Sequence, residues 1–510
     1  MFNAFSGNEG KPLLPLGEGT TTRRLSGSKC SMAIHLDNHF TNRIYNSSSS
    51  LSGHVKIDAF KETPFDKIQI LFLGTSKTRM EGVRGPHTTA HTFLKLEMPI
   101  SASSYPARRI YKAGQTYSIP FNFIVPNQLT INACNHNIDS AAVHDSHLCL
   151  PPSLGPWSGK DDFSPEMARV EYTVIARVLA EEDDNGKRAK ILEDSHPVRV
   201  LPTHDELPPL HITPNDKLYK MSKTKTLRKS LLTGKIGKVT LTARQPGAIM
   251  LSPDATSAST TKVHIDLVFD PTSSHSLPPS VTGTSSKITA VTYYSAGAIN
   301  GFPNMGDWIR AFGAESRGSY PSSTTLAASH VESFRWRQNI RLETRRGSTL
   351  STNTVSTDGT DWVSDTERSG HGSDLDRRRG SKDCTKELSP VYHTASLQVP
   401  VELPVNKKMF VPSFHSCVMS RVYVLWITIS LSCNGNNSNI MLGVPLQVGV
   451  QSTEPHIDQA SPPSFETAIE EAAADDHLRP RTFSVPNVHF ENHALPGYAD
   501  LIAGRMVAAN

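Results

Sequence analysis

The densest group of side chains with chemical potential is basic. Segment 217–238 (KLYKMSKTKTLRKSLLTGKIGK) holds eight basic residues and no acidic one. Clustered Lys and Arg attract acidic lipid headgroups and phosphorylated peptides, so we expect a patch for one of these, with a solvated basic linker as the alternative. Nucleic acid would be drawn to the same charge, but no aromatic interleaving or recognition module accompanies it. The expected patch consists of Lys217, Lys220, Lys223, Lys225, Arg228, Lys229, Lys235 and Lys238.

Arginines shortly before a serine form a second kind of chemical signal. The clearest case is Ser484, which has Arg481 three residues before it and Pro486 two residues after it. This spacing matches the phosphoserine ligand of 14-3-3 adaptors, whose arginines pair with the phosphate. Short motifs also arise by chance, but four such serines lie in stretches that we expect to be flexible and accessible, so we predict that at least one of them is phosphorylated. The candidates are Ser26, Ser348, Ser381 and Ser484.

Templates for catalysis or metal binding are not recognised in the sequence. It has no GxSxG, HExxH, P-loop or GxGxxG motif, and its six cysteines form no CxxC pair. The 21 histidines are scattered, without Cys or Asp at a metal-ligand spacing. We therefore expect no catalytic residue, no cofactor and no metal site, and a protein that is not an enzyme.

The overall composition is that of a globular protein with unfolded parts. The chain has 510 residues, 37% hydrophobic residues and a net charge of +4, which allows about three domains and does not point to a polyanionic partner. The first residues contain no apolar signal segment, and the longest apolar run, 422–431, is half the length of a membrane helix of about 20 residues. Few, scattered cysteines suit a reducing compartment, so we expect a cytoplasmic protein.

Alternation of apolar and polar residues predicts strands as the elements that position these groups. The best case is 170–180, where Val170, Tyr172 and Val174 begin one apolar face, as a half-buried antiparallel strand requires. In 117–123, Pro120 marks an edge or bent strand. Many short strands between Pro- and Gly-containing turns favour β-sandwiches. Further strands are expected at 55–59, 68–72, 198–202, 238–243, 263–269, 288–294, 397–403, 422–431 and 443–450.

Changes in composition divide the chain into five parts. A polar arm precedes the first strands, Pro-rich sequence separates two sets of strands, and a Ser-, Thr-, Gly- and Arg-rich stretch interrupts the second set. The expected parts are a disordered arm at 1–30, a first β-sandwich at 31–203, a Pro-rich and then basic linker at 204–240, a second β-sandwich at 241–450 with a disordered insertion at about 312–388, and a tail at 451–510 with short helices.

Four strings in this order resemble one family. AGQTYSIPFNFIVPNQL at 113–129, with Pro-Phe-x-Phe-x-x-Pro at 120–126, resembles arrestin N-terminal domains, as do HLCLPPSLG at 147–155 and VEYTVIARVL at 170–179. LTARQPGAIMLSP at 241–253 resembles the opening of arrestin C-terminal domains. The resemblance is to the fungal alpha-arrestin type and covers roughly 31–450 apart from the insertion.

The resemblance implies two immunoglobulin-like β-sandwiches without catalytic activity. Such proteins are cytoplasmic trafficking adaptors, peripherally associated with the plasma membrane or endosomes. They bind the cytoplasmic tails of transporters or receptors and recruit HECT-type ubiquitin ligases, which leads to endocytosis. Recruitment normally uses PPxY motifs, which dock into WW domains.

The chain departs from this pattern because it contains no PPxY. The nearest strings are PPSF at 462–465, which replaces Tyr by Phe, and LPGY at 495–498, which replaces the first Pro by Leu. Two other functions therefore stay open: a ligase-independent sorting or signalling scaffold of the same fold, and a nucleic-acid-binding β-sandwich. The WW-ligand candidates are Pro462, Pro463, Phe465, Leu495, Pro496 and Tyr498.

Overall fold

The computed structural model describes residues 30–452, except 83–84, 158, 183–187, 214–215, 229–233, 307, 309–315, 327–333, 342–389 and 434. This part of the chain is built of β-strands, with short 3-10 turns and one α-helix, α1 (Ala141–Leu148). The predicted all-β class is confirmed. No helix among the described residues is long and apolar enough to cross a bilayer. The 3-10 turns are η1 (Ala102–Ser104), η2 (Ala107–Arg109), η3 (Ile131–Ala133) and η4 (Pro303–Met305).

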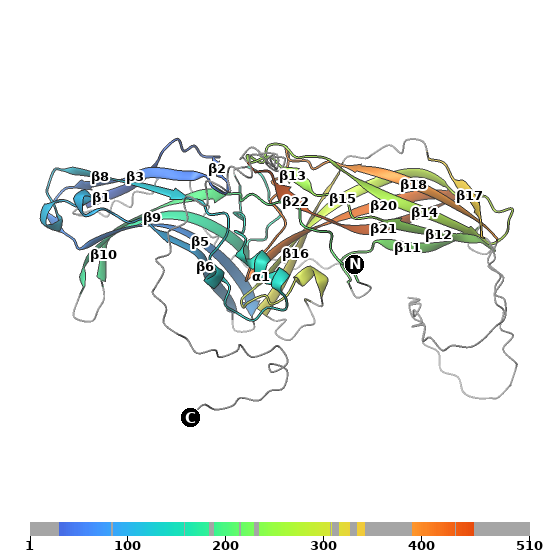
Figure 1. The fold of residues 1–510 in the computed structure, drawn as a ribbon, viewed down its shortest axis with the longest axis horizontal. Helices are drawn as coiled ribbons and strands as arrows, with labels where there is room; N and C mark the ends of the chain where they lie inside the picture. The colour runs from blue at the N-terminus through green and yellow to red at the C-terminus, as the bar shows by residue number, and fades with distance from the viewer. Residues whose placement is uncertain are drawn as a thin grey trace, which may run out of the picture. The chain divides into compact units, whose positions relative to one another are not determined.

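The N-terminal half forms two main sheets, drawn in blue to cyan-green in Figure 1. One is three-stranded in the order β1 (Cys30–Leu36), β3 (Ser50–Ala59) and β8 (Thr116–Ile124). The other is five-stranded in the order β2 (Ile44–Tyr45), β10 (Arg188–Val200), β9 (Ala168–Glu182), β5 (Lys67–Gly82) and β6 (Gly85–Glu97). A two-stranded sheet pairs β4 (Thr63–Pro64) with β7 (Ile110–Tyr111). We call these sheets the N-terminal sandwich.

The apolar faces predicted from alternation form the core of the N-terminal sandwich. Along β9, the buried residues alternate with partly exposed ones, and Val170, Val174 and Val178 are fully buried. The ring of Phe72 on β5 contacts that of Phe123 on β8, which joins the two sheets. β8 lies at an edge of its sheet, as Pro120 predicted, because proline cannot donate to a second neighbouring strand.

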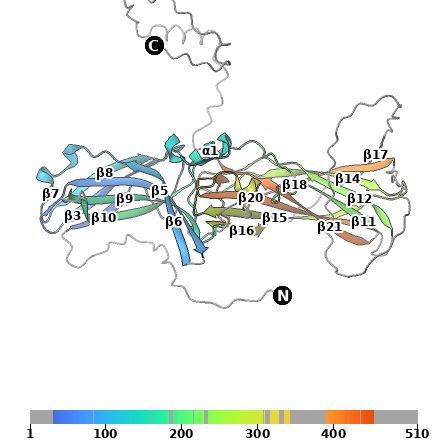
Figure 2. The same ribbon diagram turned by 90° about the horizontal axis from the view of Figure 1, so that it is seen from below.

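The C-terminal half forms two five-stranded sheets, drawn in green to orange in Figures 1 and 2. We call them the C-terminal sandwich. One sheet has the order β11 (Ser222–Arg228), β12 (Lys235–Ala243), β14 (Thr261–Pro271), β18 (Val391–Val401) and β17 (Arg337–Ile340). The other contains β16 (Arg317–Thr325), β15 (Ser280–Ser295), β20 (Met419–Cys433), β19 (Phe414–His415) and β21 (Asn436–Leu446), which pairs with β20. β13 (Ile249–Leu251) pairs with β22 (Val448–Val450) in parallel.

Two segments differ from their expected structure. The basic half of the expected linker contains β11 and the start of β12, paired over Ser222–Arg228. The expected insertion contains β16 and β17, and the indole N–H of Trp336 donates to the carbonyl of Pro279 at 2.7 Å. β16 and β17 are edge strands of mostly exposed polar residues, so the apolar alternation that reveals a strand is absent from them. Residues 1–29 of the arm, residues 342–389 of the insertion and residues 453–510 of the tail lie outside the described residues.

Candidate functional site

Most of the short motifs predicted from sequence lie outside the described residues. This holds for the four candidate phosphoserines and for both strings that resemble PPxY. Their roles stay predictions. The residues concerned are Ser26, Ser348, Ser381, Ser484, Pro462, Pro463, Phe465, Leu495, Pro496, Tyr498 and, from the basic segment, Lys229.

The described basic residues of 217–238 do not share one surface. Side chains alternate between the two faces of a strand, and Lys225 lies on the same side of β11 as the buried Leu227. Its ammonium group donates to the carbonyl of Asn439 on the facing sheet at 3.2 Å. Lys238 on β12 pairs with Thr226 and so lies on the opposite face. The structure therefore places Lys225 and Lys238, two members of the expected patch, on opposite faces of one sheet.

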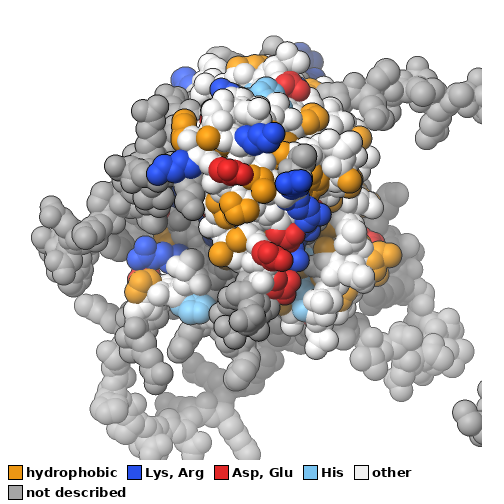
Figure 3. All heavy atoms as spheres, turned by 90° about the vertical axis from the view of Figure 1, so that its left-hand side faces the viewer, with side chains coloured by type: hydrophobic (Ala, Val, Ile, Leu, Met, Phe, Trp, Pro, Cys, Tyr) orange, Lys and Arg blue, Asp and Glu red, His pale blue; other side chains and the backbone are white. Residues whose placement is uncertain are grey.

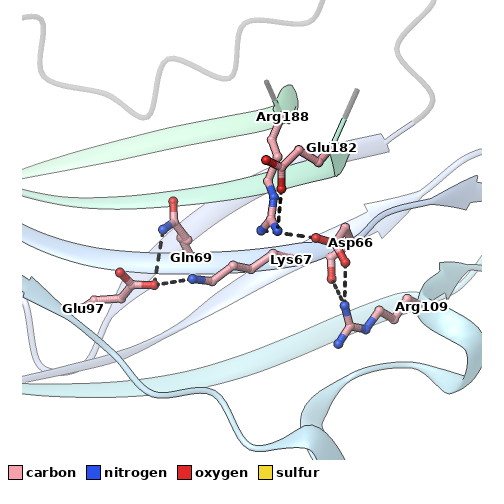
Figure 4. A network of polar contacts seen from close by, with 7 residues as sticks. All are labelled: Asp66, Lys67, Gln69, Glu97, Arg109, Glu182 and Arg188. Atoms are coloured by element: carbon pink, nitrogen blue, oxygen red, sulfur yellow. Dashed lines mark hydrogen bonds and ion pairs between the residues drawn. The ribbon is translucent and has the colours of Figure 1, made fainter. Parts of the chain in front are cut away.

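Charged side chains on the N-terminal sandwich are largely paired with each other. Asp66 accepts from Arg109 at 2.6 Å and forms an ion pair with Arg188 at 3.2 Å (Figure 4). Glu97 accepts from Lys67 at 2.8 Å, a bond that lowers the pKa of Glu97. Figure 3 shows acidic and basic side chains intermixed over this end of the molecule. On the face drawn there, this intermixing offers a polyanion no extended positive field.

The two sandwiches contact each other through a polar junction, which consists of Asp161, Asp162, Thr292, Lys408 and Arg421. Lys408 donates to the carboxylate of Asp161 at 2.7 Å. Burial alone would raise the pKa of Asp161, but the hydrogen bonds from Lys408 and from the backbone N–H of Phe163 outweigh it and lower that pKa. The junction thus holds opposite charges from the two sandwiches together.

Arg421 is the buried centre of this junction. It lies on β20 and its side chain is fully buried. Its guanidinium donates to the carbonyl of Asp162 at 2.8 Å and to the hydroxyl of Thr292 at 2.9 Å. The Asp162 carboxylate in turn accepts from the N–H of Gly155 at 2.8 Å. A buried cation needs such partners because desolvation is costly.

Four side chains that the sequence did not connect meet elsewhere in the described residues, and we call them the Cys–His cluster. They are Cys134, His136, His147 and Cys417, and their ligand atoms all lie within 4.8 Å of one another. Cys134 follows η3 and His147 belongs to α1, whereas Cys417 lies between β19 and β20 of the C-terminal sandwich. Three of the four are buried, and His136 is partly exposed. The cluster therefore spans both sandwiches.

Burial shifts the pKa of two members of this cluster, His147 and Cys417. Desolvation, followed by the neighbouring His136 and His144, lowers the pKa of His147 to about 4, so its imidazole is neutral near pH 7. Desolvation and the neighbouring Cys134 raise the pKa of Cys417 to about 12. A cavity of about 10 Å³, the size of one water molecule, adjoins His147 and Cys417. It is far too small for an organic substrate.

Sequence reasoning did not connect the four residues of the Cys–His cluster, and its expectation of no metal site stays a prediction. Cys134 and His136 form a short Cys-x-His pair, and this pair was the available signal. The fourth member, Cys417, is remote in sequence, and only the contact between the sandwiches brings it close. Motifs based on spacing cover residues close together in sequence, so they do not reveal a cluster whose members come from both sandwiches.

Known proteins give no family assignment for the chain. No protein-family model matches the chain, and no curated protein matches it. The fold and the sites described above therefore rest on the residues themselves.

Proposed function

We propose that this chain is a non-catalytic trafficking adaptor of the arrestin-like kind, with one arrestin-like β-sandwich in each half. It binds the cytoplasmic tails of plasma-membrane transporters or receptors and recruits a HECT-type ubiquitin ligase for their ubiquitination and endocytosis. Phosphorylation of the segments outside the two sandwiches regulates it. It acts in the cytoplasm, at the surface of the plasma membrane or endosomes.

The polar junction is the observation that carries the proposal. An adaptor must present two binding faces in a fixed relation, and a fully buried Arg421 with partners in both sandwiches supports this. Fold analogy alone is weak evidence of function. The junction adds a specific reason for two sheet pairs to act as one unit.

The positions of the resembling strings also support it. Phe121 and Phe123 of the first string are buried on β8. In the second, the carbonyl of Pro151 accepts from the Tyr172 hydroxyl at 2.6 Å, and Leu154 pairs with Val170. These strings thus occupy structural positions in the core, which is consistent with a family signature.

The tail tests the recruitment half of the proposal. Deleting 455–510 leaves every described residue in place, and we expect it to abolish co-purification with a WW-domain ligase from native cells. Tyr498→Ala and Phe465→Ala, made separately and together, show which string docks. Loss of ligase with the variants and full recovery with Ser464→Ala, a matched change inside PPSF, supports docking. Unchanged ligase recovery after the deletion contradicts it.

The ligase-independent scaffold remains a second candidate, because both strings lack a full PPxY. It predicts that the two variants leave cargo ubiquitination unchanged while cargo binding persists. Proximity labelling in native cells separates the two functions. Transporter and ligase neighbours together favour the first, and transporter neighbours without a ligase favour the second.

A further inference from the structure

The Cys–His cluster contains the donor set of a structural zinc site. Two thiols and two imidazoles are the ligands of the Cys₂His₂ class, which Zn²⁺ binds tetrahedrally with no open position. Softer sulfur donors combined with imidazole favour zinc over the oxygen-seeking Mg²⁺ or Ca²⁺. The four ligands come from residues that are mostly buried, and burial protects thiolate ligands from solvent and oxidation.

The spacing of the donor atoms fits that geometry. A tetrahedron with zinc–ligand bonds of roughly 2.0–2.3 Å has edges of about 3.3–3.8 Å. The Sγ atom of Cys134 lies 3.4 Å from Nε2 of His136 and 3.4 Å from Nδ1 of His147. With all donor atoms within 4.8 Å of one another, movements of a few tenths of an ångström to about 1 Å complete the tetrahedron.

His136 also has the hydrogen bond that orients a metal ligand. Its Nδ1 lies 2.8 Å from the carbonyl of Asn137. A carbonyl only accepts, so Nδ1 carries the proton and Nε2 presents its lone pair to the cluster. Metal-bound histidines usually donate their second N–H to a carbonyl or carboxylate in this way.

Two simpler explanations compete with a metal. One is a network of hydrogen bonds, in which the single proton of the Cys134 thiol is directed at one of two imidazoles. The other is a disulfide between Cys134 and Cys417, but both cysteines are free in the structure. A disulfide would involve only the two cysteines. Hydrogen bonds link Cys134 to Cys417 and to both imidazoles, but two thiol protons cannot serve all three contacts, whereas a cation accepts a lone pair from each of the four ligands at once.

We propose that Cys134, His136, His147 and Cys417 bind one Zn²⁺ ion, which cross-links the N-terminal and C-terminal sandwiches. Both thiols lose their protons to solvent on binding, and the ion is structural because four protein ligands close its coordination. This inference is independent of the proposed adaptor function, since it concerns what holds the two sandwiches together.

The test uses the full chain purified under reducing conditions and equilibrated with zinc. We expect one zinc per chain by elemental analysis. Replacing zinc with Co²⁺ should give the visible absorption bands of tetrahedral cobalt with thiolate ligands. Cys417→Ser and His136→Gln should each lower the zinc content several-fold. Cys149→Ser is the matched control, because Cys149 neighbours α1 but contacts the Asp145 carbonyl rather than the cluster, and it should retain the full equivalent.

The outcomes that overturn the proposal are distinct from misfolding. Circular dichroism first establishes that each variant is folded, and the partly exposed His136 provides the mildest substitution. Folded wild-type chain that takes up no zinc contradicts the site. So does His136→Gln or Cys417→Ser with a wild-type zinc content, or a Cys134–Cys417 disulfide found by mass spectrometry in freshly prepared, reduced protein.

Discussion

At the scale of single residues, Arg421 shows how a buried charged side chain can connect two sandwiches. Its guanidinium donates to a carbonyl from one sandwich and a hydroxyl from its own. A planar, always charged group with several donors suits this position better than lysine does. The exposed Arg244 offers a contrast, because its guanidinium pairs with the carboxylate of Asp266 at 3.0 Å on the surface.

We expect Arg421→Met to destabilise the protein by about 1–3 kcal/mol. The substitution keeps much of the volume but leaves the Asp162 carbonyl and the Thr292 hydroxyl without their donor, and an unsatisfied buried group costs about 1–3 kcal/mol. The measurement is the midpoint of urea unfolding. Arg244→Met is the control and should change stability by less than about 1 kcal/mol, as exposed pairs do. Equal midpoints for the two variants would show that the junction does not need the buried cation.

At the scale of the elements, β3 depends on a glycine at its centre. β3 lies between β1 and β8, with Gly53 opposite Leu36 on one side and Phe121 on the other. A Cβ at Gly53 would lie 2.2 Å from the carbonyl oxygen of His35. Backbone cannot yield as a flexible side chain does, so only glycine lets these strands approach.

Gly53→Ala should therefore destabilise the protein by about 1–3 kcal/mol or more, the usual cost of overpacking. Gly283 on β15 is the matched control, because it is also a strand glycine but a Cβ there meets nothing within 4 Å. Gly283→Ala should be neutral or stabilise by up to about 1 kcal/mol, since alanine restricts the unfolded chain. Thermal and urea denaturation of both variants gives the comparison. A Gly53→Ala protein as stable as Gly283→Ala would mean that β1 shifts at little cost.

The burial pattern of each strand explains whether the sequence could predict it. β9 and β14 alternate buried and exposed residues along nearly their whole length, so their type and their core faces follow from the pattern. β11 carries Lys223 and Lys225 on one face and Thr224 and Thr226 on the other, and it buries only Leu227. Its strand conformation depends on pairing with β12, and a local sequence pattern does not predict this pairing.

At the scale of the whole molecule, several separate contacts join the sandwiches of residues 30–452. Besides the junction, the N–H of Asp139 donates to Asn300 at 2.8 Å and the hydroxyl of Thr78 donates to Ser295 at 3.0 Å. His204, in the Pro-rich stretch, pairs with Val450. These contacts lie in both sandwiches and in the chain between them, so the covalent connection is only one of the links.

We expect the two sandwiches to stay together after the connection is cut. A protease site inserted after the exposed Thr213 separates them covalently, and the two pieces should co-elute in size-exclusion chromatography like the uncut protein. Adding Arg421→Met should weaken this association, and Arg244→Met should leave it unchanged. Two separately eluting pieces from otherwise unaltered protein would contradict a stable junction.

The sequence by itself determined the class of the fold and the composition of the core. Alternation has a period of two wherever a strand has one buried face, and this is a local property that the chain displays directly, as on β9. Only the tertiary structure decided the rest. Arg421 becomes buried, Lys225 and Lys238 separate onto two faces, and Cys417 meets His147 because the two sandwiches contact each other. A junction or a side-chain cluster of this kind depends on positions in space, which spacing along the chain does not record when the residues come from separate sandwiches.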